Sequence, residues 1–174
     1  YSDVLNHMKD DSDIVFWSPL PEEAFEEVKI LHKIQIEYKN IKFPVEGILT
    51  RLLKESSTYA RLHYNAKIQN NDSILVNWQK DGKNFKLKQL YSLAENIGAW
   101  AFKRYERILK LEERSQKFWK RDIINSYKND LKLLTPNSIF IPHQRVANLM
   151  PICIAAEELN IPVVSAIYSW DNLP

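Results

Sequence analysis

The chain has 174 residues, of which 45% are hydrophobic, and a formal net charge of +2. This length and apolar content are enough for a domain with a buried core, and the small net charge predicts no nucleic-acid partner. Cys153 is the only cysteine, which excludes a disulfide framework and favours a reducing compartment. A phosphate-binding loop of the P-loop or GxGxxG type is excluded as well, because the three glycines are scattered at Gly47, Gly82 and Gly98.

The first third of the chain alternates helical and strand patterns. Residues 1–10 resemble the tail of a helix, and the apolar residues 14–17 predict a buried strand that ends at Ser18. Pro21 and the two glutamates after it predict a helix start, and the alternation in residues 34–38 predicts an edge strand. An α/β domain usually opens with a strand, so we expect that a first strand precedes this sequence. The expected inner face of the helix consists of Ala24, Phe25, Val28 and Leu31.

The next segment favours a helix and then a hairpin. From Pro44 onward an i, i+4 stripe predicts a helix, and the stripe consists of Ile48, Leu49, Leu52 and Leu53. Residues 74–78 resemble a short strand, and the Asp81-Gly82 turn after them favours a hairpin, with a helix as the alternative interpretation.

Residues 87–134 form a helix-rich segment. Gly98 is expected to separate or kink two helices, and a second break is expected around residues 112–117, where the apolar stripe fails. Residues 103–132 carry ten Lys and Arg against five Asp and Glu. Such a basic helix with aromatic residues fits either a solvated outer face or a peripheral contact with an anionic membrane surface.

The C-terminal segment, from residue 138 to residue 174, has a strand–helix–strand pattern. Two apolar runs, residues 138–141 and 163–168, flank a helical pattern that ends near Asn160. This order predicts a βαβ unit with parallel strands, and the apolar runs are typical of strands covered by helices on both faces. Polar residues follow each strand, namely His143, Gln144 and Arg145 after the first and Ser169, Trp170, Asp171 and Asn172 after the second. Ligands bind at the carboxyl ends of such strands, so we expect both groups at one edge of the sheet.

The residue types at this edge can act as a base, bind an anion or stack on a flat ring. A transfer to a hydroxyl group would need a general base, for which His143 and Asp171 are the candidates. Arg145 can clamp a phosphate or carboxylate group, and the indole of Trp170 can stack on a sugar ring or an aromatic group. Gln144, Ser169, Asn172 and Ser18 are further candidate substrate-binding residues.

Each of these residues also has a structural interpretation. His143 can cap the following helix, and Asp171 or Asn172 can form an Asx turn or an N-cap. Arg145 can pair with Glu157 or Glu158. Trp170 can fill an interface with another domain, and Ser18 can serve mainly in a turn.

The motif HQR after one strand and YSWDNLP after the next resembles the N-terminal half of bacterial GT-B-type glycosyltransferases, in particular transferases of surface-polysaccharide synthesis with an SWDN signature. The resemblance covers Ser138–Pro174 and implies two Rossmann-like domains with the active site in the cleft between them. Residues 1–174 would then be a single three-layer α/β domain with a mostly parallel sheet, truncated at both ends. The resemblance further implies that this domain binds a glycan or lipid-linked acceptor, while a missing C-terminal domain holds most of the nucleotide-sugar donor.

This interpretation requires no metal or other cofactor and predicts a cytoplasmic protein that can contact the inner membrane face through residues 103–132. Two other classes remain open. One is a stand-alone α/β module that binds a small anion with Arg145 and His143. The other is an interaction domain whose basic helix docks on a membrane or on a partner chain.

Overall fold

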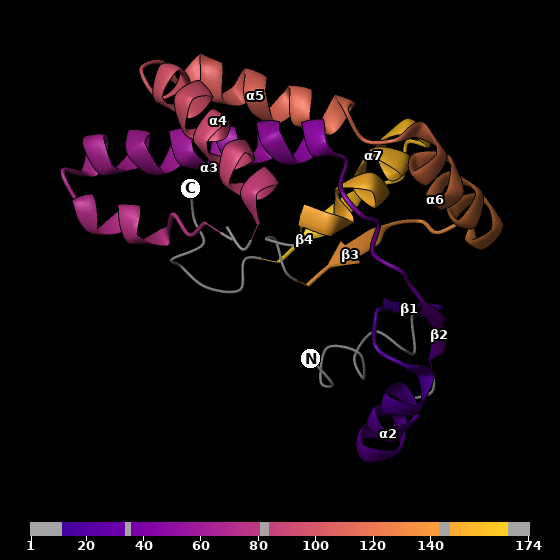
Figure 1. The fold of residues 1–174 in the computed structure, drawn as a ribbon. Helices are drawn as coiled ribbons and strands as arrows, with labels where there is room; N and C mark the ends of the chain where they lie inside the picture. The colour runs from indigo at the N-terminus through magenta and orange to yellow at the C-terminus, as the bar shows by residue number, and fades with distance from the viewer. Residues whose placement is uncertain (1–11, 34–35, 81–83, 143–146, 167–174) are drawn as a thin grey trace. The chain divides into compact units, whose positions relative to one another are not determined.

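The computed structural model describes residues 12–33, 36–80, 84–142 and 147–166. The chain divides into two compact units, Tyr1–Pro44 and Val45–Pro174, each of which is described by itself. The described residues form helices and short parallel strands, which confirms the α/β class with helices predominating (Figure 1). The division into units does not test the prediction of a single domain, which stays a prediction.

The first unit is a small βαβ unit. It contains β1 (Val15–Ser18), α2 (Glu22–His32) and β2 (Glu37–Asn40), and β1 pairs with β2 in parallel. The predicted strand at residues 14–17 and the helix after Pro21 are confirmed, and the second strand begins later than its apolar alternation indicated. The ring of Phe25 stacks between those of Phe16 and Tyr38, with centroids 5.2 and 4.6 Å apart. This aromatic stack fastens α2 to both strands.

The inner face of α2 is narrower than its sequence pattern predicted. Phe25 is 2% exposed, but Val28 is 38% exposed and Leu31 is 75% exposed. Two short strands offer little surface to cover, so only the side chains directly above them are buried. The assignment of Leu31 to the inner face is therefore wrong for the unit as the structure describes it.

The second unit is built on three long helices that contact one another. These are α3 (Ile48–Gln69), α4 (Phe85–Ala101) and α5 (Tyr105–Lys117), and α3 runs beside both of the others (Figure 1). A hydrophobic core lies among them. It is formed by buried Ala60, Ala101, Ile108 and Leu111, with Leu53, Tyr64, Ile97, Phe102 and Tyr105 packed around it. The small side chains allow the helices to approach closely.

The hairpin predicted after residue 74 is wrong. The chain instead forms a 3₁₀ helix, η1 (Asp72–Asn77), and α4 starts at Phe85. Asparagine side chains begin both elements: the Oδ1 atom of Asn71 accepts from the Ser73 N–H at 3.1 Å, and that of Asn84 accepts from the Leu87 N–H at 2.9 Å. These N-caps satisfy backbone donors that a hairpin would have paired across its strands.

Gly98 does not separate two helices, although the sequence pattern predicted a break or a kink there. It lies inside α4, where a Cβ atom would come within 2.6 Å of the Tyr59 ring and 2.9 Å of the Ser56 carbonyl oxygen. The glycine therefore permits close contact between α3 and α4. The chain breaks later, at residues 102–104, and again between α5 and α6 (Arg121–Leu134), just beyond the predicted residues 112–117.

The second unit also contains the βαβ unit predicted for the C-terminal segment. The chain runs through β3 (Ile139–Ile141), η2 (Ala147–Leu149), α7 (Met150–Glu158) and β4 (Val163–Ser165), and β3 and β4 are parallel. Burial of both sheet faces is not observed, because Phe140 is 53% exposed and Val164 is 55% exposed. The described strands form two two-stranded sheets, whereas the sequence predicted one mostly parallel sheet.

No helix in the described ranges has the length and apolar character needed to cross a membrane.

Candidate functional site

The carboxyl edge of the β3–β4 sheet is the part of the candidate site that the structure describes. Ile139 lies opposite Val163 and Ile141 lies opposite Ser165. Hydrogen bonds close both ends of the pair, from the Ile139 N–H to the Pro162 carbonyl at 2.8 Å and from the Ala166 N–H to the Ile141 carbonyl at 3.0 Å. Both strands therefore end at the same edge, as parallel pairing requires.

Seven of the eight predicted site residues lie outside the described residues. They are His143, Gln144, Arg145, Ser169, Trp170, Asp171 and Asn172. Their roles as base, clamp, stacking surface or cap remain predictions. The structure describes the strand residues that precede them, up to Pro142 after β3 and Ala166 after β4.

Ser18, the eighth predicted residue, holds a turn at the end of β1. It is 5% exposed, and its Oγ atom accepts a hydrogen bond from the Leu20 N–H at 3.2 Å. Its carbonyl oxygen accepts from the Ile41 N–H at 2.9 Å and from the Tyr38 hydroxyl at 3.3 Å. The Tyr38 hydroxyl also donates to the Leu20 carbonyl. These contacts agree with the turn interpretation of Ser18.

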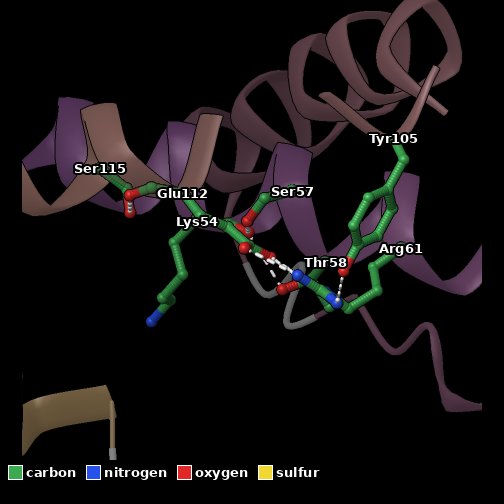
Figure 2. Close-up of polar contacts among 7 residues, drawn as sticks. All are labelled: Lys54, Ser57, Thr58, Arg61, Tyr105, Glu112 and Ser115. Atoms are coloured by element: carbon green, nitrogen blue, oxygen red, sulfur yellow. Dashed lines mark hydrogen bonds and ion pairs between the residues drawn. The ribbon is translucent and has the colours of Figure 1, made fainter. Parts of the chain in front are cut away.

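A charged cluster that sequence reasoning missed joins α3 to α5. The Nε atom of Arg61 donates to Glu112 Oε1 at 2.9 Å, and Nη2 reaches Oε1 and Oε2 at 2.5 and 2.7 Å. Nη1 donates to the Tyr105 hydroxyl at 3.3 Å, and Arg61 lies between its two partners (Figure 2). On the adjoining turns, the Ser57 hydroxyl donates to the Lys54 carbonyl, and the Ser115 hydroxyl donates to the Glu112 carbonyl.

This Arg61 cluster acts as a clamp between helices. Burial opposes the charged form of Arg61, yet the hydrogen bonds with Glu112 and Tyr105 outweigh it and raise the pKa of the guanidinium group above its ordinary value. Three of its nitrogens already donate to protein oxygens. Because its guanidinium group is directed at the Glu112 carboxylate, Arg61 has a structural role and is not placed to bind an anionic ligand.

An aromatic cluster fastens η1 against α3 and α4. The Trp78 ring makes edge contacts with Tyr59 and Tyr91, at centroid distances of 5.3 and 5.8 Å. Its Nε1 atom donates to Glu95 Oε1 at 2.9 Å, and Lys80 Nζ lies 2.5 Å from the same oxygen. Burial acts to raise the pKa of Glu95, but the bonds from Lys80 and Trp78 outweigh it and lower this pKa below its ordinary value. The polar atom of Trp78 is thus occupied within the protein.

Two side chains of α7, Glu158 and Cys153, bear on the structural interpretations of Arg145 and of the cysteine. Both carboxylate oxygens of Glu158 accept bonds from α6, from Arg121 at 2.7 and 3.2 Å and from Lys128 at 2.9 Å. These bonds lower the pKa of Glu158 to about 2. Cys153 is half-buried, and burial raises the pKa of its thiol. A half-buried thiol with a raised pKa fits a packing role better than that of a nucleophile.

No local signal in the sequence indicated the two clusters. Arg61 and Glu112 are 51 positions apart, and Trp78 and Glu95 are 17 apart. Helical periodicity places such residues on a face but does not say which helices meet. The N-caps at Asn71 and Asn84, by contrast, involve residues two or three positions apart, so they belong to the short-range patterns that a sequence can show.

Among residues 12–33, 36–80, 84–142 and 147–166, no group of three or more His, Cys, Asp or Glu side chains is arranged to hold a metal ion. Comparisons with protein-family models, with curated proteins and with solved structures found no match to this chain.

Proposed function

We propose that this chain is the acceptor-binding, N-terminal part of a GT-B-type glycosyltransferase that moves a sugar from a nucleotide-sugar donor to a glycan or lipid-linked acceptor. The observation that carries the proposal is the parallel pairing of β3 and β4. Both strands end at one edge, and the structure describes the backbone there up to Pro142 after β3 and up to Ala166 after β4, directly before the candidate residues in sequence. That topology is the one the proposed acceptor site needs.

The proposed reaction gives these residues distinct roles. His143 or Asp171 removes the proton from an acceptor hydroxyl, whose oxygen bonds to the anomeric carbon of the donor sugar. The bond from that carbon to the nucleoside diphosphate breaks, and the diphosphate leaves with the electron pair. Arg145 favours the phosphate groups of a lipid-linked acceptor, and Trp170 stacks on a sugar ring.

The environment of Glu158 weakens one of the two structural alternatives for Arg145. The structural alternative has Arg145 paired with Glu157 or Glu158. The carboxylate of Glu158 is already bound by Arg121 and Lys128 through both of its oxygens. A second guanidinium would have to compete with these bonds, so Glu158 is a poor partner for Arg145.

Calorimetric titration tests the proposal. The 174-residue chain and the full chain that its open reading frame encodes would be titrated with a short-chain prenyl diphosphate disaccharide and with UDP-glucose, GDP-mannose and CDP-glucose. We expect the acceptor probe to bind both chains, because its site lies in this domain. A nucleotide sugar should bind only where a second Rossmann-like domain is present.

Substitutions then locate the site. Arg145→Ala should weaken binding of the acceptor probe at least about tenfold, as expected for loss of a charge-assisted contact. His143→Ala and Asp171→Asn should leave binding nearly unchanged, and whichever of the two replaces the base should abolish sugar transfer by a chain that binds both substrates. The matched control is Lys132→Ala, which removes an exposed charge on α6. Binding of inorganic phosphate through Arg145 without binding of any sugar probe would instead favour the small-anion module.

A further inference from the structure

We propose that one side of α5 is a docking surface for an anionic lipid bilayer. The surface consists of Arg107, Lys110, Arg114 and Lys117, called here the basic stripe, with Trp100 and Phe118 at its two ends. The sequence pattern implicated thirty residues, 103–132, in this role or in simple solvation. On the structure, the candidate surface is confined to one side of α5. This inference does not depend on the proposed transferase activity.

The spacing of the basic stripe places its residues on a single side of α5. The four residues follow one another at intervals of three, four and three positions, and an α-helix turns by about 100° per residue. They therefore fall within about a quarter of the helix circumference. Ile108 and Leu111 are buried, so the apolar side of α5 is used in contact with α3 (Figure 1). The basic stripe lies on an adjoining side of the helix, where Lys110, Arg114 and Lys117 are exposed and Arg107 is partly buried.

The segment that contains the basic stripe carries a concentrated positive charge. Between residues 103 and 120 there are seven basic residues and three acidic ones, a net charge of +4, which leaves −2 for the rest of the chain. Of the three acids, Glu112 is engaged by Arg61, and Glu113 pairs with Lys117 at 2.5 Å. Within the part of the chain that the structure describes, no ion pair is formed by Lys110 or Arg114, both of which are exposed.

Exposed aromatic rings stand at both ends of the stripe. Trp100, at the end of α4, is 54% exposed, and the Arg107 guanidinium lies 4.2 Å from the centre of its ring. Arg107 Nη1 also donates to the backbone carbonyl of Trp100 at 3.0 Å, which holds the guanidinium beside this residue. Phe118, directly after α5, is 49% exposed. Tryptophan and other aromatic rings favour the headgroup level of a bilayer, where an apolar face meets a polar boundary.

A bilayer fits this surface better than a nucleic acid does. The stripe from Arg107 to Phe118 is about 16 Å long and straight, so a flat anionic surface can meet all of it at once. A polyanion that wrapped the protein would also meet the remaining surface, whose net charge is negative. Because the apolar side of α5 is buried, binding should be mainly electrostatic, with a smaller contribution from the two rings.

The test is co-sedimentation of the 174-residue chain with lipid vesicles. We expect binding to phosphatidylcholine vesicles that contain about 30% phosphatidylglycerol at about 0.1 M salt, and loss of binding at about 0.5 M salt, where screening is stronger. Pure phosphatidylcholine vesicles should not bind the chain. Neither kind of vesicle contains sugar or nucleotide, so failure here would leave the proposed transferase activity untouched.

Two triple variants with the same net charge distinguish the effect of the basic stripe from the effect of the total charge. The stripe variant carries Lys110→Ala, Arg114→Ala and Lys117→Ala, and the control carries Lys67→Ala, Lys86→Ala and Lys88→Ala, at exposed positions in α3 and α4. Each basic residue near an anionic leaflet strengthens binding by a factor of about five, so the stripe variant should bind on the order of a hundredfold more weakly. The control should change binding by less than about threefold. Circular dichroism would verify that both variants keep their helices.

The aromatic ends are tested separately. The double variant Trp100→Ala and Phe118→Ala should weaken vesicle binding about fivefold or more while leaving its salt dependence in place. Equal loss of binding in the stripe variant and the control would overturn the proposal, because only total charge would then matter. Tighter binding of the stripe to duplex or single-stranded oligonucleotides than to the vesicles would overturn it too.

Discussion

At the scale of single residues, the Arg61–Glu112 ion pair joins α3 to α5. Its three hydrogen bonds lie in a half-buried position, where charge-assisted bonds are less screened than at the surface. We expect a double-mutant cycle of Arg61→Ala and Glu112→Ala to give a coupling energy of about 1–2 kcal/mol.

Urea unfolding of the four proteins in this cycle measures the coupling. The exposed pair of Lys117 and Glu113, four positions apart on α5, provides the matched control. Its coupling should be distinctly smaller, because solvent screens exposed pairs. Equal coupling in the two cycles would show that the Arg61 cluster does not clamp the helices.

Glu158 makes stability depend on pH at the junction of α6 and α7. Its folded pKa of about 2 lies below the ordinary value of 4.5, because Arg121 and Lys128 bond to its charged form. A lowered folded pKa stabilises the fold above about pH 4.5, and this stabilisation is lost as the pH falls toward 2. Glu158→Gln should therefore lower the urea midpoint at pH 7, and the difference from the native chain should shrink by pH 2.

The control for this pH dependence is Glu157→Gln, which changes the adjacent carboxyl group. Urea titrations at pH 7, 4 and 2 would be run on all three chains. A Glu158→Gln variant that differs from the native chain by the same amount at every pH would contradict the linkage.

At the scale of elements, Gly98 sets how closely α4 approaches α3. Alanine favours helices by about 1 kcal/mol over glycine, yet its Cβ atom here would meet the Tyr59 ring at 2.6 Å and the Ser56 carbonyl at 2.9 Å. The steric conflict should prevail, so Gly98→Ala should destabilise the fold by about 1–3 kcal/mol.

Thermal and urea unfolding would measure this change. Gly47→Ala is the comparison, because a Cβ atom there meets only Thr50 Oγ1, at an ordinary 3.8 Å. Its effect should stay below about 1 kcal/mol. A Gly98→Ala variant at least as stable as the native chain would mean that α3 and α4 do not pack this closely.

The elements that the sequence predicted well are those with strong local patterns. Proline and glutamates after β1 gave the start of α2, and the strand–helix–strand order of the C-terminal segment gave the parallel pair β3–β4. The residues Ile74–Trp78 were predicted to form a strand because β-branched residues favour strands. They lie instead in and directly after η1, and asparagine N-caps at Asn71 and Asn84 begin η1 and α4. Gly98 misled because glycine weakens an isolated helix but permits close packing in a folded one.

For the chain as a whole, the sequence correctly predicted the α/β class. The predicted three-layer arrangement around one sheet is not confirmed. The described strands form two parallel pairs, each joined through a helix, and Phe140 and Val164 of the second pair remain exposed. The sequence pattern shows that a strand is apolar, but it does not show which helices, if any, pack against the faces of that strand. The candidate site depends on segments beyond β3 and β4, so its location and the roles of its side chains stay predictions.

The most direct test of that location is methyl-resolved NMR during titration with the prenyl diphosphate disaccharide. Ile141 and Ala166 mark the carboxyl edge of the β3–β4 sheet, and Ile139 and Val163 mark the opposite end, about 7 Å away. We predict that the largest shifts fall on the methyl groups of Ile141 and Ala166, and that Arg145→Ala abolishes them. Binding whose largest shifts fall on the opposite end of the strands, or on the helices α3 to α5, would contradict an acceptor site at this edge.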